Sequence, residues 1–189
     1  MDDSPDEREH WHGAADDPEV FQALYRRYFK RVYAYVAARI GNPHDAEDVV
    51  SEVFLKVLKN LRDMRSRQPA SFAAWLFVTA RNTVTDYYRR NGHATALVQL
   101  DEAAPVAAEE QEPEHVAGQR EIAAQLGALV GALPERKREI VTLKYYGGLR
   151  NHEIAIVLGI GEKTVAAYLS RALDELQSKS AASQLQDEI

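Results

Sequence analysis

The stretch from Arg150 to Leu173 constrains the fold of this chain more than any other part of its sequence. Its small residues fall where two helices that meet at a tight turn require them. Ala155 lets the helices approach, Gly159 permits a left-handed turn, and Val165 points back into the shared core. The pattern predicts a helix-turn-helix. One apolar set runs through both helices and consists of Ile154, Leu158, Ile160, Val165, Leu169, Ala172 and Leu176.

The second helix of this motif carries a mixed polar face opposite its apolar one. Any two amphipathic helices joined through a glycine imitate part of the pattern, so the continuity of the apolar set is what favours the motif. The opposite face is expected to enter the major groove of duplex DNA. That face consists of Lys163, Thr164, Ala167, Ser170 and Arg171.

Length and composition exclude several other classes of protein. The 189 residues, 46% of them apolar, suffice for one ordinary domain or two small helical ones. The absence of cysteine excludes disulfides, thiolate zinc sites and a thiol switch on this chain. The polar N-terminus does not resemble a secretory signal, and no apolar run approaches membrane-spanning length, so we expect a cytoplasmic protein.

The sequence offers no support for catalysis or a cofactor. It contains neither a glycine-rich phosphate loop nor a nucleophile elbow. His10 and His12 flank Trp11 near the N-terminus, but two ligands without a third do not predict an ordered metal site. We therefore expect no enzyme, no cofactor and no resident metal.

The formal net charge of −6 is unevenly distributed along the chain. Residues 1–16 hold six acids and one base, and residues 92–118 hold six acids and no lysine or arginine. By contrast, residues 17–91 hold thirteen bases and eight acids, and residues 119–179 hold nine and seven. The parts expected to fold are basic, as nucleic-acid binding requires, although the whole chain is acidic.

Helical periodicity predicts an N-terminal domain of three helices over residues 17–91, after an unfolded acidic extension over 1–16. Asp17 and Pro18 start the first helix, which Gly41 to Pro43 ends. The second helix opens near Asp45, and its apolar stripe ends at Leu61, after which we expect a basic loop. Ser71 caps the third helix, in which Phe72 and Trp75 are expected in the core.

A change of composition predicts a linker over residues 92–118. This segment is rich in Ala, Glu, Gln and Pro, and its few apolar groups cannot repay the entropy of ordering it. Helical periodicity resumes at residue 119 and predicts a C-terminal domain of four helices to residue 179, followed by a tail over 180–189. The fold class is all-α, with two small helical domains joined by a flexible acidic linker.

These features together resemble the bacterial sigma-70 superfamily, and more narrowly its extracytoplasmic-function (ECF) group. The resemblance rests on DAEDVVSEVFLKVLKNL (45–61), SFAAWLFVTARNTVTDYYRR (71–90), LPERKREIVTLKYYGGL (133–149) and the helix-turn-helix. It covers nearly all of both domains in the expected order. It implies sigma-2-like and sigma-4-like domains in a non-enzymatic protein that binds core RNA polymerase and directs it to promoters.

The resemblance implies two binding surfaces on the N-terminal domain. The second helix is expected to dock on the coiled coil of the largest polymerase subunit, although a solvated acidic helix face is the plain alternative. The third helix and the loop before it are expected to melt and read the minus-10 element. The polymerase-binding residues are Asp45, Glu47, Asp48, Val49, Glu52, Val53 and Phe54, and the minus-10 residues are Arg62, Arg65, Arg67, Arg81, Tyr87, Tyr88, Arg89 and Arg90.

For the C-terminal domain the resemblance implies reading of the minus-35 duplex. Arg150 and Asn151 are expected at the DNA backbone, and Lys163, Thr164, Ala167, Ser170 and Arg171 at base edges. The recognition helix departs from many relatives, because Ala166-Ala167-Tyr168 replaces a Lys-Ser-Arg run and Gly161 replaces a Ser or Thr cap. The promoter sequence is therefore not inherited from the resemblance.

The resemblance implies further partners, and one alternative function stays open. The family's linker threads near the polymerase active centre, its second domain meets the polymerase flap, and an anti-sigma factor is an expected partner. The site of action is then the bacterial cytoplasm, on the nucleoid when in holoenzyme, without membrane insertion. The alternative is a one-component helix-turn-helix regulator that binds operator DNA as a dimer; an enzyme of nucleic-acid processing lacks the carboxylates and phosphate loop it would need.

Overall fold

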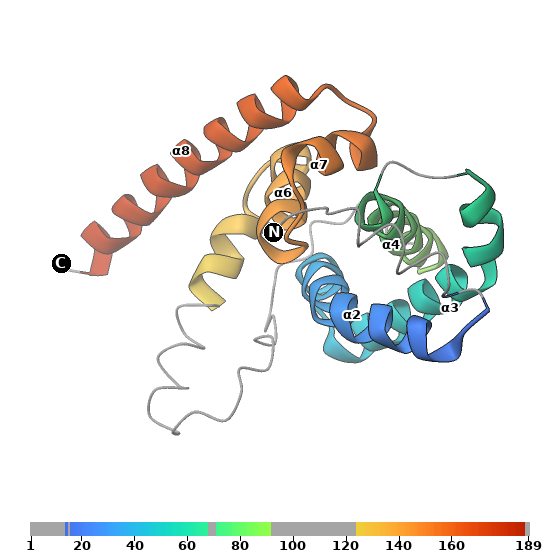
Figure 1. Ribbon diagram of the computed structural model, residues 1–189. Coiled ribbons are helices and arrows are strands. Elements are labelled where there is room, and N and C mark those ends of the chain that lie inside the picture. Colours follow the sequence, from blue (N-terminus) through green and yellow to red (C-terminus); the bar gives the residue numbers. More distant parts are fainter. Residues whose placement is uncertain (1–13, 15, 68–70, 92–123, 188–189) are drawn as a thin grey trace.

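The computed structural model describes residue 14 and residues 16–67, 71–91 and 124–187, with only the backbone considered for 64–67 and 181–187. Within these ranges every regular element is helical, which confirms the all-α fold class. Figure 1 shows α2, α3 and α4 as one bundle, with α6 and α7 beside it and α8 on the far side of α6 and α7. The predicted linker over 92–118, His10 and His12 lie outside the described residues.

The N-terminal domain consists of the three helices that the sequence predicts. Helix α2 runs Pro18–Ile40; Asp17 accepts from the Glu19 backbone N–H at 2.8 Å, and Gly41 ends the helix with a φ of 80°. Helix α3 runs Pro43–Arg67, and α4 runs Phe72–Arg90. Ser71 Oγ accepts from the Ala74 N–H at 3.2 Å, which confirms it as the cap of α4.

The C-terminal domain has four helical segments, as expected. Residues 124–131 are helical, α6 runs Glu135–Val141 and continues into a π-helical turn, η1, at Thr142–Tyr146. The helix-turn-helix is formed by α7 (Asn151–Leu158) and α8 (Glu162–Asp187). Gly159 has a φ of 63°, and Val165 is fully buried, so both residues have the roles that the motif assigned to them.

Three expected boundaries are corrected. Helix α3 does not end at Leu61 but continues to Arg67, so the predicted basic loop begins as helix. Residues 62–67 contain no helix breaker, and Pro69 is the first residue that disfavours continuation. Helix α8 likewise continues through the predicted tail to Asp187. At the N-terminus, Ala14 is buried, so the predicted unfolded extension is packed near its end.

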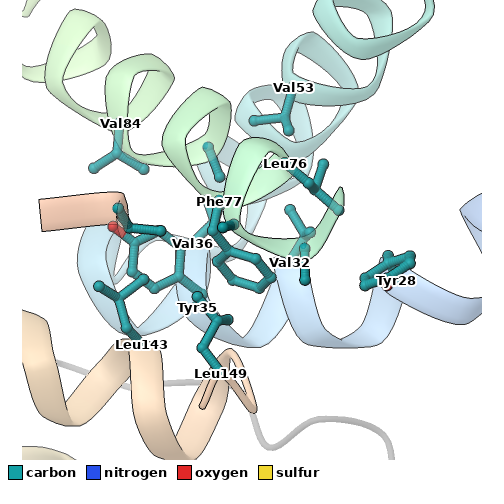
Figure 2. Packing of buried hydrophobic residues seen from close by; sticks show 14 of the residues in the cluster. Tyr28, Val32, Tyr35, Val36, Val53, Leu76, Phe77, Val84, Leu143 and Leu149 are labelled. Atoms are coloured by element: carbon teal, nitrogen blue, oxygen red, sulfur yellow. The ribbon is translucent and has the colours of Figure 1, made fainter. Parts of the chain in front are cut away.

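One apolar core runs through both domains without a break. Figure 2 shows Tyr35 of α2 and Phe77 of α4 facing Leu143 and Leu149 of the C-terminal domain. The rings of Tyr35 and Phe77 meet edge to face with centroids 5.6 Å apart, and all four side chains are fully buried or nearly so. The two domains therefore share a packed boundary.

The two glycines around the helix-turn-helix turn make a matched pair for testing its geometry. An added Cβ at Gly159 would meet no atom within 4 Å, so the only obstacle to substitution there is the left-handed backbone. We expect Gly159→Val to destabilise the protein by about 1–3 kcal/mol, measured by chemical denaturation. Gly161→Ala, whose Cβ would have an ordinary 3.6 Å contact with Thr164, is expected to be nearly neutral. Equal stability of the two variants would contradict this account of the turn.

Candidate nucleic-acid and polymerase interfaces

The expected recognition face of α8 is open to solvent. Lys163, Thr164 and Ala167 are exposed, as are Ser170 and Arg171 one turn further on. The opposite face of α8 packs against α7 through Val165, Leu169 and Ala172, which are all buried. A helix fixed along one side and free along the other has the geometry that major-groove reading requires.

The entry to α7 is fixed by a buried carboxylate. Glu153 accepts from the Arg150 backbone N–H at 2.8 Å, and its other oxygen accepts from the Ser71 hydroxyl at 2.7 Å. Asn151 is half-buried, and its side-chain oxygen accepts from Lys144 at 3.1 Å. The residues expected at the DNA backbone therefore sit on a rigid turn, and the same carboxylate also ties that turn to the cap of α4.

The cations expected at the minus-10 element pair with carboxylates of the same chain. Arg81 donates to Glu139 of the C-terminal domain at 2.8 Å. The other pairs lie within the N-terminal part of the chain: Arg89 with Asp86 at 3.0 Å, Arg90 with Glu52 at 2.8 Å, and Arg62 with Asp16 at 3.6 Å. The side chains of Arg65 and Arg67 lie outside the described residues.

The two tyrosines at the end of α4 are half-buried and both engage neighbouring helices. Tyr87 donates to Asp45 at 2.7 Å, and Tyr88 donates to the backbone carbonyl of Arg39. Burial, followed by the nearby Asp45 carboxylate, raises the pKa of Tyr87, and burial also raises that of Tyr88. Both hydroxyls thus fasten α4 to its neighbours, and neither ring stands free on the surface.

The expected polymerase surface on α3 needs a correction. Val49, Val53 and Phe54 are buried in the core of the N-terminal domain, so they are not available for contact with a partner. Glu47 and Asp48 are exposed, whereas Asp45 and Glu52 are half-buried and hydrogen-bonded. Burial would raise the pKa of Glu52, but hydrogen bonds from Arg90 and Lys56 outweigh it and lower that pKa.

The outward stripe of α3 carries two apolar side chains that the sequence analysis did not select. Leu55 and Leu58 are 55% and 47% exposed. They lie one and two turns beyond Ser51, and Asp48 lies one turn before Ser51; Asp48 and Ser51 are exposed on the same side. The sequence contains a signal for this orientation. A helix that buries Val50, Val53 and Val57 on one face must present positions 55 and 58 away from that face.

The boundary between the domains holds a cluster of charged groups. Arg39 of α2 and Arg138 of α6 both donate to Glu135, and Arg31 donates to the carbonyls of Gly147 and Gly148 at 2.8 and 3.1 Å. Burial would raise the pKa of Glu135, but the two guanidinium groups outweigh it and lower that pKa. A cavity of about 570 Å³ lies beside this cluster, lined by Arg39, Arg81, Arg89, Arg136, Glu135, Glu139, Tyr35, Tyr88, Val84 and Thr85.

This boundary between the domains was not predicted, although the sequence of α2 contains a signal for it. Residues 33–40 read YAYVAARI and are apolar on almost every side of the helix. A helix that is apolar all round is buried all round. Ala34, Tyr35 and Ala38 are indeed buried together with the expected Val36 and Ile40. The extra buried face contacts η1 of the C-terminal domain.

Two features are absent from the described residues: a membrane-spanning helix and a cluster of metal ligands. No helix there combines the length and apolarity needed to cross a membrane. In the same part of the chain, no three His, Cys, Asp or Glu side chains converge as a metal ion would require.

Known proteins are similar to this chain in sequence and in fold. The model for sigma-70 region 2 matches residues 24–94, and that for sigma-70 region 4 matches residues 123–176. RNA polymerase sigma factor CnrH of Cupriavidus metallidurans is 32% identical over 172 residues, which cover 87% of this chain and 88% of CnrH. The solved structure of CnrH in complex with the cytosolic domain of CnrY has a TM-score of 0.67 at 22% identity, with coverage of 93% of this chain and 97% of that one, and it supports the fold.

Two ECF sigma factors are similarly related. SigE of Mycolicibacterium smegmatis and BldN of Streptomyces coelicolor are each 32% identical, over 82% and 86% of this chain. The aligned regions span 59% and 61% of those two proteins. The paired matches to regions 2 and 4, in that order, and the near full-length similarity to CnrH identify the chain as a member of the ECF group of the sigma-70 family.

Proposed function

We propose that this chain binds core RNA polymerase and directs it to promoters that carry a minus-10 and a minus-35 element. The observation that carries the proposal is the exposed recognition face of α8, in a domain that matches sigma-70 region 4. That domain follows, in the sequence, a domain that matches region 2. Reading two elements at once requires one DNA-binding surface on each domain, and residues 17–91 and 119–179 each hold more bases than acids.

The minus-35 element is assigned to α7 and α8. Lys163 and Arg171 are the long cationic side chains on the exposed face, and Thr164, Ala167 and Ser170 are short. Short side chains bring the helix backbone close to the groove floor, where the Ala167 methyl favours contact with thymine methyl groups. Specificity is therefore expected to come from apolar contact and DNA shape as well as from direct hydrogen bonds.

The minus-10 element is assigned to α4 and the end of α3. Arg62, Arg89 and Arg90 are exposed and lie at the ends of these helices, where phosphates of a melted strand are within reach. Their carboxylate partners are also exposed or half-exposed, and such surface ion pairs contribute little stability. Phosphates therefore displace these partners at small cost.

The polymerase is assigned to the outward stripe of α3, formed by Asp48, Ser51, Leu55 and Leu58. Two exposed leucines on consecutive turns gain free energy when a partner covers them, and the acidic Asp48 sets the charge of that partner. This assignment keeps Asp48 from the residues expected on sequence grounds and replaces the buried Val49, Val53 and Phe54 with Leu55 and Leu58.

An anti-sigma protein is a further proposed partner. CnrH has been solved with the cytosolic domain of CnrY bound to it. The exposed leucines of α3 and the exposed face of α8 are surfaces that an inhibitory protein of this kind would have to cover. The contacts with the polymerase flap and the path of residues 92–118 through the polymerase remain part of this proposal.

The function itself is tested by transcription with purified bacterial core polymerase. Addition of this chain is expected to give run-off transcripts from a subset of promoters in a genomic library, and these transcripts are absent with core enzyme alone. The control is the same reaction with a chain truncated before α8, which lacks the recognition helix. No new transcript, together with tight binding of the free chain to palindromic duplex DNA as a dimer, would support a one-component regulator in its place.

The polymerase surface is tested by replacing its leucines. We expect Leu55→Ser together with Leu58→Ser to weaken binding to core polymerase by about tenfold or more, because two apolar side chains lose a buried contact. The measurement is an equilibrium titration of labelled chain with core enzyme. Leu126→Ser is the control, since Leu126 is 49% exposed but lies on the C-terminal domain. Equal affinities of the two variants would refute the assignment.

The recognition face is tested at Arg171. We expect Arg171→Ala to reduce transcription from promoters with an intact minus-35 element by roughly tenfold, the value of one good base or phosphate contact, while binding to core polymerase is retained. Gln177→Ala, an exposed residue further along the same helix, is expected to have no effect. Loss of polymerase binding in the Arg171 variant would mean that the residue is structural.

A further inference from the structure

We propose that the cavity lined by α2, α4 and α6 binds a small ligand that carries a diphosphate group. The cavity has a volume of about 570 Å³. Pockets for small organic ligands have volumes of about 300–1,000 Å³, whereas a nucleic-acid duplex is far too large to enter such a space. The proposal concerns a ligand other than polymerase and promoter DNA, although the cavity shares Arg81 and Arg89 with the surface proposed for the minus-10 element.

Cations outnumber carboxylates at this cavity. The lining cations are Arg39, Arg81, Arg89 and Arg136, and the lining carboxylates are Glu135 and Glu139. The excess is unchanged when the hydrogen-bond partners behind the lining are included, since Arg138 donates to Glu135 and Asp86 accepts from Arg89. Five guanidinium groups and three carboxylates then give a local formal charge of +2. The cavity therefore favours a ligand with at least two negative charges.

Two of the lining arginines keep donors that no carboxylate uses. Arg136 is half-buried and makes no hydrogen bond or ion pair with another described residue. The side chain of Arg39 is 12% exposed and donates to Glu135, but its Nε has no hydrogen-bond partner among the described residues. A guanidinium group has five N–H donors, and a buried donor without an acceptor is unfavourable. An anion in the cavity supplies the acceptor oxygens that these arginines lack.

The two carboxylates hold the other cations in place. Glu135 uses a different oxygen for each of its two partners, Arg39 and Arg138. Glu139 accepts from Arg81 at 2.8 Å, and the Glu139 side chain is only 8% exposed, so this pair fixes the Arg81 guanidinium group at the cavity wall. Side chains that are already ordered lose little conformational freedom when a ligand binds. The cavity is thus preorganised for an anion.

The chemistry of the lining favours linked phosphoryl groups over a single small anion. A guanidinium group stays charged at any relevant pH and donates two parallel hydrogen bonds to phosphate oxygens. The cations stand on three helices, α2, α4 and α6, and a diphosphate offers several acceptor oxygens on two connected groups. Val84 and Tyr88 add apolar surface to the lining, against which an organic group attached to the diphosphate can pack.

The test is equilibrium binding to the full-length chain in the absence of polymerase and DNA. Inorganic pyrophosphate and ADP are titrated by calorimetry at about 0.15 M salt, which screens weak surface binding. We expect saturable binding at one site per chain, with inorganic phosphate at least about tenfold weaker because it has fewer charges and acceptors. Tighter binding of ADP than of pyrophosphate would identify an organic diphosphate as the ligand, and equal or weaker binding would identify pyrophosphate itself; both results support the site.

The site is located by Arg136→Ala, which removes a lining cation that pairs with no described residue. We expect this variant to bind pyrophosphate about tenfold more weakly or worse. Arg26→Ala is the matched control, because Arg26 is an exposed arginine of α2 that does not line the cavity, and its loss changes the net charge equally. The affinity of this control is expected to stay within about twofold of the unmodified chain.

A second variant tests the charge of the cavity without removing an arginine. Thr85 is exposed and lines the cavity, so Thr85→Glu adds a carboxylate to the lining. We expect it also to weaken pyrophosphate binding by roughly tenfold, because like charges repel. Far-UV circular dichroism checks that each variant keeps its helices.

Three outcomes would overturn the proposal. The first is no saturable binding of pyrophosphate or ADP up to about 10 mM. The second is an Arg136 variant, folded, that binds as tightly as the Arg26 variant. The third is single-stranded DNA that binds with the same dependence on Arg136 while pyrophosphate does not bind, which would assign the cations to nucleic acid. Because no measurement here involves transcription, each of these results leaves the proposed function unaffected, and a failure of the run-off experiment leaves this site unaffected.

Discussion

The burial of α2 on two neighbouring sides is the constraint on which the rest of the structure depends. One side packs on α3 and α4 through Val32 and Val36, as in any small bundle. The next side, which carries Arg31 and Tyr35, meets η1 and the turn at Gly147. Because both cores include the same helix, neither domain's packing is independent of the other. Burial of the Tyr35 hydroxyl and the neighbouring Glu139 carboxylate raise its pKa, so the side chain stays neutral in this core.

The pairing of cations with carboxylates bears on how an acidic protein can carry the proposed DNA-binding surfaces. The described cations of the minus-10 surface each have a nearby carboxylate, and one of these, Glu139, belongs to the other domain. Pairing lowers the net positive charge of these proposed surfaces, and non-specific binding of nucleic acid depends on the number of phosphates that cations neutralise. The exposed pairs cost little to break, whereas the Arg81 pair joins the two domains and has a buried carboxylate.

Much of the fold was predictable because its signals are local. Asp17, Ser71 and Gly159 have roles that depend only on the backbone within a few residues, and the structure confirms all three. The length of α3 was missed for a related reason: the apolar stripe ends before the helix does, and a solvated helix continues until a residue such as Pro69 opposes it. Helical periodicity therefore locates a core face more reliably than a helix end.

The site was less predictable, since exposure depends on packing. Val49, Val53 and Phe54 lie among the acids of α3 in the sequence, but their side chains point into the bundle, and Leu55 and Leu58 point out. The pairing of Arg81 with Glu139 joins residues 58 positions apart in different domains, and no local pattern encodes it. The apolar run at residues 33–40 indicates that α2 is buried on all sides, but it does not indicate which elements cover it.

The packing of the two domains against each other affects the two proposed promoter surfaces unequally. Lys163 and Arg171 lie on the open face of α8, away from the boundary, so the surface proposed for the minus-35 element stays accessible. Arg81, by contrast, is held within the boundary. A duplex reader needs no change in the DNA, whereas a melted strand must be stabilised as it forms, and a surface for unpaired bases is useful only at that moment. The surface proposed for melted DNA is thus partly covered by the other domain, whereas the surface proposed for intact duplex is open to solvent.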